Sequence, residues 1–341
     1  MGLLPKDADI LPPSDDRIFK LIMASPEGKP ALMDLVSAVI GRPVTDAVVR
    51  NSEIPPEDTG EKAERLDVNC GIDDGSQVDL EIQASRIEEE DDSTDNGFQN
   101  LKGKGIYYLC DLHSSQPSRG IRRYDRLART YQVTFCSYTV FPEREGFFNT
   151  FSLRHDKDNG LLSDAIHVVY VELSKLKGIL KKPVKEMTDI EKWAVFFRYA
   201  NKRRYRDTVN EVIQSKEAME MAGSLLMSVS QDEKERAVFR SRKMYQTDMQ
   251  SNWNTAYDKG EKQGRKEGRK EGRREGRMEG REEEKRALIM NMLKKGQTPE
   301  QISFLTDVPV DVVKSVEKKT RQDAVFDQVD EEPYRRKNRE A

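Results

Sequence analysis

Residues 64–83 read ERLDVNCGIDDGSQVDLEIQ, two alternating arms joined by Asp-Asp-Gly. Apolar side chains occupy every second position of each arm: Leu66, Val68, Cys70 and Ile72 in the first, Val78, Leu80 and Ile82 in the second. A period of two is typical of a half-buried strand, and Asp-Gly between two such arms predicts a β-hairpin. This hairpin decides the fold, because its register fixes which polar side chains share a face.

The length of the turn sets the register. A three-residue Asp-Asp-Gly loop with Gly75 in the left-handed conformation places Val68 opposite Leu80 and Asp67 opposite Glu81. A two-residue turn would mix polar and apolar side chains on each face, so the pattern disfavours it. We therefore predict the three-residue loop.

This register predicts a face that carries opposed carboxylates. Asp67 lies opposite Glu81, and Gln83 follows along the same face. Like charges directly opposite each other destabilise a sheet unless something offsets them, and a divalent cation would do so. The alternative is an acidic hairpin face exposed to solvent. The residues alone leave both interpretations open.

The bulk properties limit the class of protein. The chain has 341 residues, enough for about two domains at roughly 150 residues each. Its net charge is −3, so nucleic-acid binding would need a local basic patch. Three cysteines make no disulfide framework and indicate a reducing, cytoplasmic setting. We expect no signal peptide and no membrane span.

The order of patterns predicts a mixed α/β domain over residues 15–176, followed by a helical extension over residues 177–258. Helices come first, then three strands, a helix and further strands, of which residues 131–141 form a buried strand. Asp15 or Asp16 can cap the first helix, and Asp16 could instead add an acidic group to the hairpin face.

Residues 259–284 form a charged repeat with glycine at every fourth position from Gly260 to Gly280. As a helix its glycines drift by about 40° per repeat, and each costs about 1 kcal/mol relative to alanine. We expect i,i+4 pairs between its charged side chains to offset part of that cost. A spacer, a self-association stalk and a phosphate-binding track are the possible functions, and the interleaved glutamates count against the track.

Residues 285–320 are predicted to form a small helical module that resembles a helix-turn-helix unit. It offers few side chains suited to reading bases, so a packing or oligomerisation role is equally consistent. The tail is thus a candidate for assembling a homo-oligomer. Residues 321–341 are highly charged and are expected to be disordered.

Asp67, Glu81 and Gln83 form the D…E-x-Q variant of the PD-(D/E)XK nuclease constellation. Other stretches resemble landmarks of the Rpn-type recombination-promoting nuclease and transposase family: DRIFK at 16–20, LDV at 66–68, LEIQ at 80–83, GIYY at 105–108 and YVELSK at 170–175. The resemblance covers residues 15–200, and the tail matches in style.

That resemblance implies a restriction-endonuclease-like core, a mixed sheet flanked by helices, and Mg²⁺-dependent cleavage of DNA phosphodiester bonds. Asp67 and Glu81 would bind Mg²⁺, which polarises the phosphate and lowers the pKa of the attacking water. Gln83 stands where the superfamily has lysine, so it can orient water but cannot neutralise charge. Lys104 or Lys20 would supply that positive charge.

A second hypothesis is a catalytically inactive DNA-binding or oligomerisation protein that keeps the nuclease fold. The missing lysine at position 83, the acidic segment 88–95 and the tail of repeat and helices support it. The acidic segment 88–95 lies beside the proposed site and would repel a phosphate backbone. Glycine and proline residues within 103–124 are expected to disturb the helix behind the active strand.

Overall fold

The computed structural model describes residues 3–50, 68–84, 96–116 and 124–319. The chain divides into two compact units, Met1–Gln246 and Thr247–Ala341, called here the first and second units. Among the described residues no helix combines the length and the apolar composition needed to cross a membrane. The domain boundaries expected from the sequence remain predictions.

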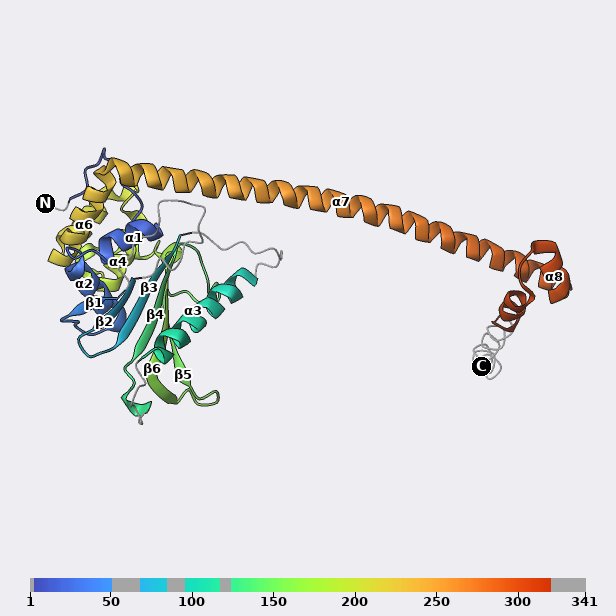
Figure 1. The fold of residues 1–341 in the computed structure, drawn as a ribbon, viewed down its shortest axis with the longest axis horizontal. Coiled ribbons are helices and arrows are strands. Elements are labelled where there is room, and N and C mark those ends of the chain that lie inside the picture. The colour runs from blue at the N-terminus through green and yellow to red at the C-terminus, as the bar shows by residue number, and fades with distance from the viewer. Residues whose placement is uncertain (1–2, 51–67, 85–95, 117–123, 320–341) are drawn as a thin grey trace, which may run out of the picture. The chain divides into compact units, whose positions relative to one another are not determined.

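The first unit is built on a six-stranded mixed sheet in the order β1-β2-β3-β4-β6-β5 (Figure 1). Its strands are β1 (Ala47–Val49), β2 (Val68–Ile72), β3 (Gln77–Gln83), β4 (Thr130–Cys136), β5 (Phe148–Arg154) and β6 (Leu161–Glu172). The pairs β3–β4 and β4–β6 are parallel, and the remaining pairs are antiparallel. The predicted mixed α/β fold is confirmed.

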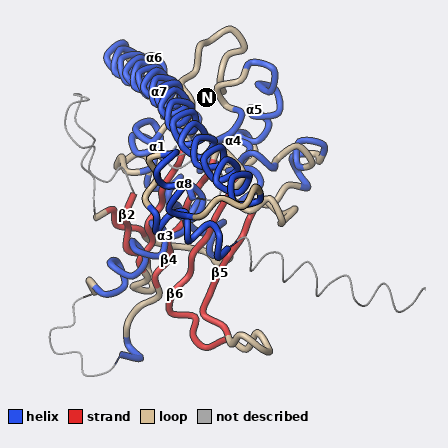
Figure 2. The backbone as a smooth tube through the Cα atoms, turned by 90° about the vertical axis from the view of Figure 1, so that its right-hand side faces the viewer, coloured by secondary structure: helices blue, strands red, loops and turns tan. Residues whose placement is uncertain are grey.

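Helices cover both faces of this sheet. They are α1 (Asp16–Met23), α2 (Lys29–Ile40), α3 (Asn96–Ser114), α4 (Asp189–Tyr199), α5 (Arg206–Gln214), α6 (Glu217–Gln231) and the start of α7 (Glu233–Lys294). Short 3₁₀ helices span Tyr124–Arg126, Leu173–Lys175, Ile179–Lys181, Val184–Glu186 and Arg203–Tyr205. On one face, Phe19 of α1 and Phe197 of α4 lie against Phe135 of β4, with ring centroids 6.3 and 5.2 Å away. Helix α3 packs on the other face, against β4 and β6 (Figures 1 and 2).

The hairpin has the predicted register over its described residues. Val68 pairs with Leu80, and Gly75 has a φ of 83°, the left-handed conformation that glycine adopts without steric cost. The Gly75 N–H donates to the carbonyl of Ile72 at 2.8 Å, which closes the three-residue loop. Asp67 lies outside the described residues.

The strand predicted over residues 131–141 is shorter than expected, because β4 ends at Cys136. Beyond it the backbone N–H groups of Val140 and Phe141 donate to one carboxylate oxygen of Glu172, at 2.6 and 3.0 Å. A fully buried carboxylate needs such donors, so this contact diverts the chain from the sheet although its residues favour a strand.

Asp15 caps α1, whereas Asp16 accepts only from the backbone N–H of Arg17, at 2.8 Å, and has a further partner on α7. The Asp15 carboxylate accepts from the backbone N–H groups of Arg17 and Ile18 at 3.1 and 3.3 Å. Burial and the neighbouring Asp16 raise the pKa of Asp15 to about 6. Asp16 accepts a hydrogen bond at 3.0 Å from Arg242 of α7.

Glycine allows α3 to lie close to the sheet. The helix runs without a break through Gly103 and Gly105, so the expected disturbance in this part of the segment 103–124 is wrong. A Cβ on Gly105 would lie 2.9 Å from the Tyr170 hydroxyl, whereas one on Gly103 would meet no described atom within 4 Å. Only Gly105 is therefore required by close packing.

A buried ion pair joins the start of α7 to α1. Arg17 donates two hydrogen bonds to the Glu235 carboxylate, at 2.8 and 2.9 Å. Their side chains are only 6% and 15% exposed. Because both charges have lost most of their water, each depends on the other for solvation.

The second unit contains the rest of α7, then α8 (Pro299–Thr306) and a helix over residues 310–319. Its small core comprises Ile289, Ile302, Val313 and Val316. A capping box of Thr298 and Gln301 begins α8.

The charged repeat 259–284 lies within α7 and is helical. The expected i,i+4 pairs are few, since a four-residue period places residues of the same kind four apart. Arginine follows arginine and glutamate follows glutamate along most of the segment. Among the described residues its one ion pair joins Arg265 to Glu261, at 3.6 Å and the edge of the repeat.

We predict that Glu235→Ala lowers the free energy of unfolding by about 1.5–3 kcal/mol, because it removes the carboxylate that accepts two hydrogen bonds from the buried Arg17 guanidinium. Glu233→Ala is the control, since Glu233 is exposed on the same first turn of α7. Urea denaturation followed by circular dichroism measures both variants. Equal and small losses would contradict the burial of the pair.

We also predict that Gly105→Ala destabilises the first unit by about 1–3 kcal/mol, because the added methyl group overpacks against Tyr170. Gly103→Ala should instead stabilise α3 by up to about 1 kcal/mol, since alanine restricts the unfolded chain and favours the helix. Thermal denaturation of the two variants gives the sign of each change. A shift in the same direction for both would show that α3 does not rest on Tyr170.

Candidate active site

Strand β3 is buried on both faces, although every second side chain on it is polar. Val78, Leu80 and Ile82 lie in the hydrophobic core. On the opposite face Gln77, Asp79 and Glu81 are only 3%, 5% and 7% exposed. We call this second set, together with Gln83 at the end of the strand, the polar row.

Neighbouring strands extend the polar row sideways. Asp79 is flanked in register by Asn69 of β2 and Gln132 of β4. Glu81 pairs with Thr134 of β4, which in turn pairs with Tyr170 of β6. Residues in register share a face, so all of these side chains lie on the α3 side of the sheet.

Lys104 of α3 supplies a positive charge at the middle of the polar row. Its Nζ forms an ion pair with Oε1 of Glu81, whose side chain is 8% exposed, against 28% for that of Lys104. The ammonium group also lies 5.3 Å from the centre of the Tyr108 ring, within the range of a cation–π interaction. The buried carboxylate is thus neutralised by a cation that itself reaches solvent.

Several amide groups beside Asp79 are buried without a described partner. Gln132 is fully buried, and neither of its side-chain polar atoms has a hydrogen-bond partner among the described residues. The same holds for Oε1 of Gln77 and Oδ1 of Asn69. Unsatisfied buried polar atoms cost free energy, which points to a ligand, an ion or water at this position.

These donors fit a hard divalent cation. Carboxylate and amide oxygens are the ligands that Mg²⁺ and Ca²⁺ prefer, and Glu81, Asp79, Asn69 and Gln132 provide both kinds. The described part of the chain contains no cluster of three histidine, cysteine, aspartate or glutamate side chains placed to hold a metal. The hairpin register predicts one further carboxylate, Asp67, opposite Glu81, and Asp67 lies outside the described residues.

Burial excludes other groups nearby from acid–base work at neutral pH. It raises the pKa of the Tyr170 hydroxyl, which also lies near Cys136 and Glu81. Burial likewise raises the pKa of the Cys136 thiol, which pairs in register with Gln83 and so shares its face. These two groups therefore remain protonated at neutral pH.

The structure brings together two of the four predicted catalytic residues, Glu81 and Lys104. Gln83 lies two positions beyond Glu81 at the end of β3 and is half-buried. Asp67 and the acidic segment 88–95 lie outside the described residues. Lys20, the other candidate for the positive charge, is buried on α1.

Asp79 and Gln132 are absent from the set predicted from the sequence. The alternation of β3 contains a signal for Asp79, because it lies two positions before Glu81 and so shares its face. Gln132 carries a weaker signal, a single amide in a segment of aromatic and β-branched residues. Only the pairing of β3 with β4 places it beside Asp79.

Comparison with known families agrees with this arrangement. Residues 13–256 match the PD-(D/E)XK nuclease family transposase group. The match includes the whole sheet, α1 to α6 and the start of α7. No curated protein and no solved structure matches the chain. With more than half of its length matched, the chain belongs to the PD-(D/E)XK nuclease family of transposases.

Proposed function

We propose that this protein is a DNA endonuclease that hydrolyses phosphodiester bonds with a divalent cation, Mg²⁺ or a similar ion. Membership of the family supports a nuclease acting on DNA. The observation that carries the proposal is the ion pair between buried Glu81 and the half-exposed Lys104 on the polar row. It offers a carboxylate for a metal and a cation for a phosphate at one place.

Asp67 and Glu81 would hold the metal, with Asp79 close by on the same strand. When bound, the metal supplies Lewis-acid polarisation of the phosphate and a lowered pKa for the attacking water. Gln83 can orient that water through its amide. It carries no charge, so it cannot stabilise the additional negative charge of the transition state.

Lys104 fills that role in the proposal. Its Nζ is paired with Glu81 here and has a route to solvent, so a phosphate oxygen can take the place of the carboxylate. A metal at Glu81 would favour this exchange, because it competes with the ammonium group for the same oxygens. Electrostatic stabilisation of this kind is usually the largest part of catalysis in phosphoryl transfer.

We predict that the wild-type chain nicks supercoiled plasmid in the presence of Mg²⁺ and that Asp67→Asn or Glu81→Gln lowers the rate by at least about 100-fold. Glu211→Gln is the control, since Glu211 is an exposed carboxylate on α5. Chelation of the metal should abolish nicking. Equal trace activity in all variants would refute the proposal, and DNA binding without cleavage would favour the inactive DNA-binding alternative.

We predict opposite effects of Lys104→Gln on metal binding and on cleavage. Glu81 loses a competing cation, so the Kd for Mn²⁺ measured by calorimetry should fall several-fold. Cleavage at saturating metal should fall by about 10–1,000-fold, because a transition-state charge partner is gone. Lys102→Gln, two positions earlier on α3, should change neither quantity. Loss of metal binding in the Lys104 variant would show that this lysine only supports the fold.

A further inference from the structure

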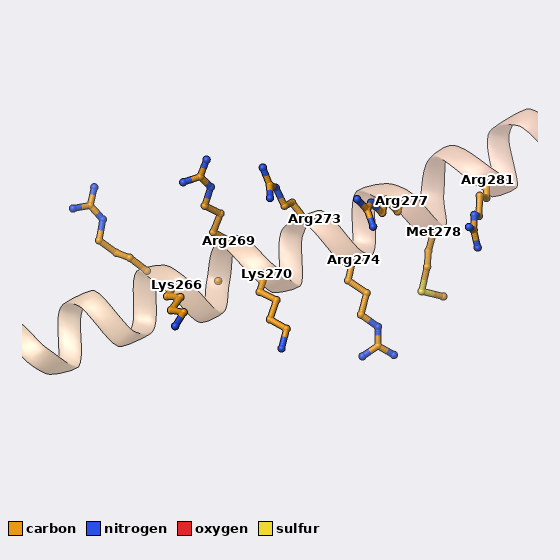
Figure 3. Close-up of a pocket in the computed structure, with 10 residues that line it drawn as sticks. Lys266, Arg269, Lys270, Arg273, Arg274, Arg277, Met278 and Arg281 are labelled. Atoms are coloured by element: carbon orange, nitrogen blue, oxygen red, sulfur yellow. The ribbon is translucent and has the colours of Figure 1, made fainter.

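The repeat in α7 arranges its residues as four parallel rows on one helix. Successive residues are 100° apart, so a four-residue period places glycine, arginine, a second mostly basic residue and glutamate on separate rows. The glycine row contains Gly264–Gly280, and the arginine row contains Arg265, Arg269, Arg273, Arg277 and Arg281. The glutamate row contains Glu267, Glu271, Glu275 and Glu279. Figure 3 shows Arg269 and Arg273 on one side of the helix and Lys270 and Arg274 on another.

This arrangement destabilises an isolated helix. Neighbours within a row carry the same charge, and like charges four residues apart on a helix repel. Each glycine also weakens the helix relative to alanine. Nothing described lies within 4 Å of a Cβ built on any glycine of the row, so no packing within the described chain accounts for them. The helix therefore lacks a partner that would compensate for both features.

The charges of the rows identify that partner. The arginine row lies about 100° to one side of the glycine row, and the glutamate row lies about 60° to the other. When two copies of this helix pack in parallel along their glycine rows, the arginine row of each faces the glutamate row of the other on both flanks. In an antiparallel pair arginine would face arginine. A polyanion such as nucleic acid would satisfy the arginine row and be repelled by the glutamate row.

Apolar residues earlier in the second unit fit the same arrangement. Met249, Trp253 and Tyr257 are 53%, 39% and 44% exposed and continue the arginine row toward the N-terminus. Next to the repeat the arginine row holds Glu261, and the glutamate row holds Gln263 and Lys259. Farther toward the N-terminus the glutamate row continues as Thr255 and Ser251, which are small and uncharged. Parallel pairing thus places large apolar side chains against small ones. At the other end the module exposes Phe304 and Leu305 by 86% and 60%, and parallel pairing brings its two copies to the same end.

We infer that the repeat of α7 is a parallel self-association seam, with a second copy of this chain as its partner. The row of residues four apart drifts in the right-handed sense, so the two helices cross in the right-handed manner of packing between i±4 ridges. Glycine allows their backbones to approach closely. This inference does not depend on the nuclease proposal.

Charge reversal in the full-length chain tests the seam. Sedimentation velocity should show a dimer of the 39.2 kDa chain. A variant with Arg265, Arg269, Arg273 and Arg277 changed to Glu, or one with Glu267, Glu271, Glu275 and Glu279 changed to Arg, should associate at least 10-fold more weakly. An equimolar mixture of the two should form a heterodimer. A variant with both exchanges keeps the composition of the wild type and should dimerise like it.

Cysteine cross-linking tests the orientation in a Cys110→Ser background, because Cys110 is the exposed native thiol. Gly268→Cys and Gly276→Cys flank Gly272 and differ by only about 80° in direction, so in a pair that crosses near Gly272 each should form an intermolecular disulfide with its own kind. Circular dichroism confirms that the variants are folded.

Four outcomes would overturn the inference. The first is a monomeric wild type at tens of micromolar, and the second is a cross-link that needs a mixture of the two cysteine variants. The third is a dimer that dissociates on nuclease treatment, which would show that nucleic acid is the partner of the repeat. The fourth is unchanged association in the single-row charge variants, which would place any dimer contact elsewhere.

Discussion

The burial of polar side chains on both sides of Asp79 is the constraint on which the rest of the first unit depends. A strand covered on both faces is most stable when it is apolar throughout, and unpaired polar groups there cost free energy. β3 instead carries Gln77, Asp79 and Glu81 on one buried face. Natural proteins typically depart from this preference for apolar buried strands at functional sites. The polar row therefore departs from what stability alone would favour, which is valine or isoleucine at these positions.

The position of α3 follows from that constraint. The helix must bring a cation to Glu81 while its backbone passes over Tyr170, and Gly105 leaves the space for this approach. A lysine at position 83 would instead have taken its orientation from the strand itself. With glutamine there, the charge of the site comes from Lys104 and depends on the packing of a helix. The electrostatics of this site are thus linked to tertiary structure more tightly than in a site whose lysine lies on the strand.

The parts of the fold that depend on local patterns were predictable. Alternation and the Asp-Asp-Gly turn were enough to predict the hairpin register, because a shift by one residue would expose the apolar face. The contact between Lys104 and Glu81 could only be guessed, since helix packing brings them together across 23 positions of sequence. The end of β4 was missed for a similar reason. Glu172, far along the chain, captures the backbone after Cys136 and overrides the strand propensity of those residues.

Helix α7 uses the same kinds of charged residue in two different ways. In the first unit Glu235 and Arg242 bind Arg17 and Asp16 of α1, and each charge has a defined partner of opposite sign. In the repeat the charges are as dense, yet almost none of them has an oppositely charged partner in the described chain. The charges of α7 are thus paired in the first unit and repeated in unpaired rows in the second. This difference fits two different partners. The first is the fold itself, and the second has to carry both signs of charge in the same four-residue period.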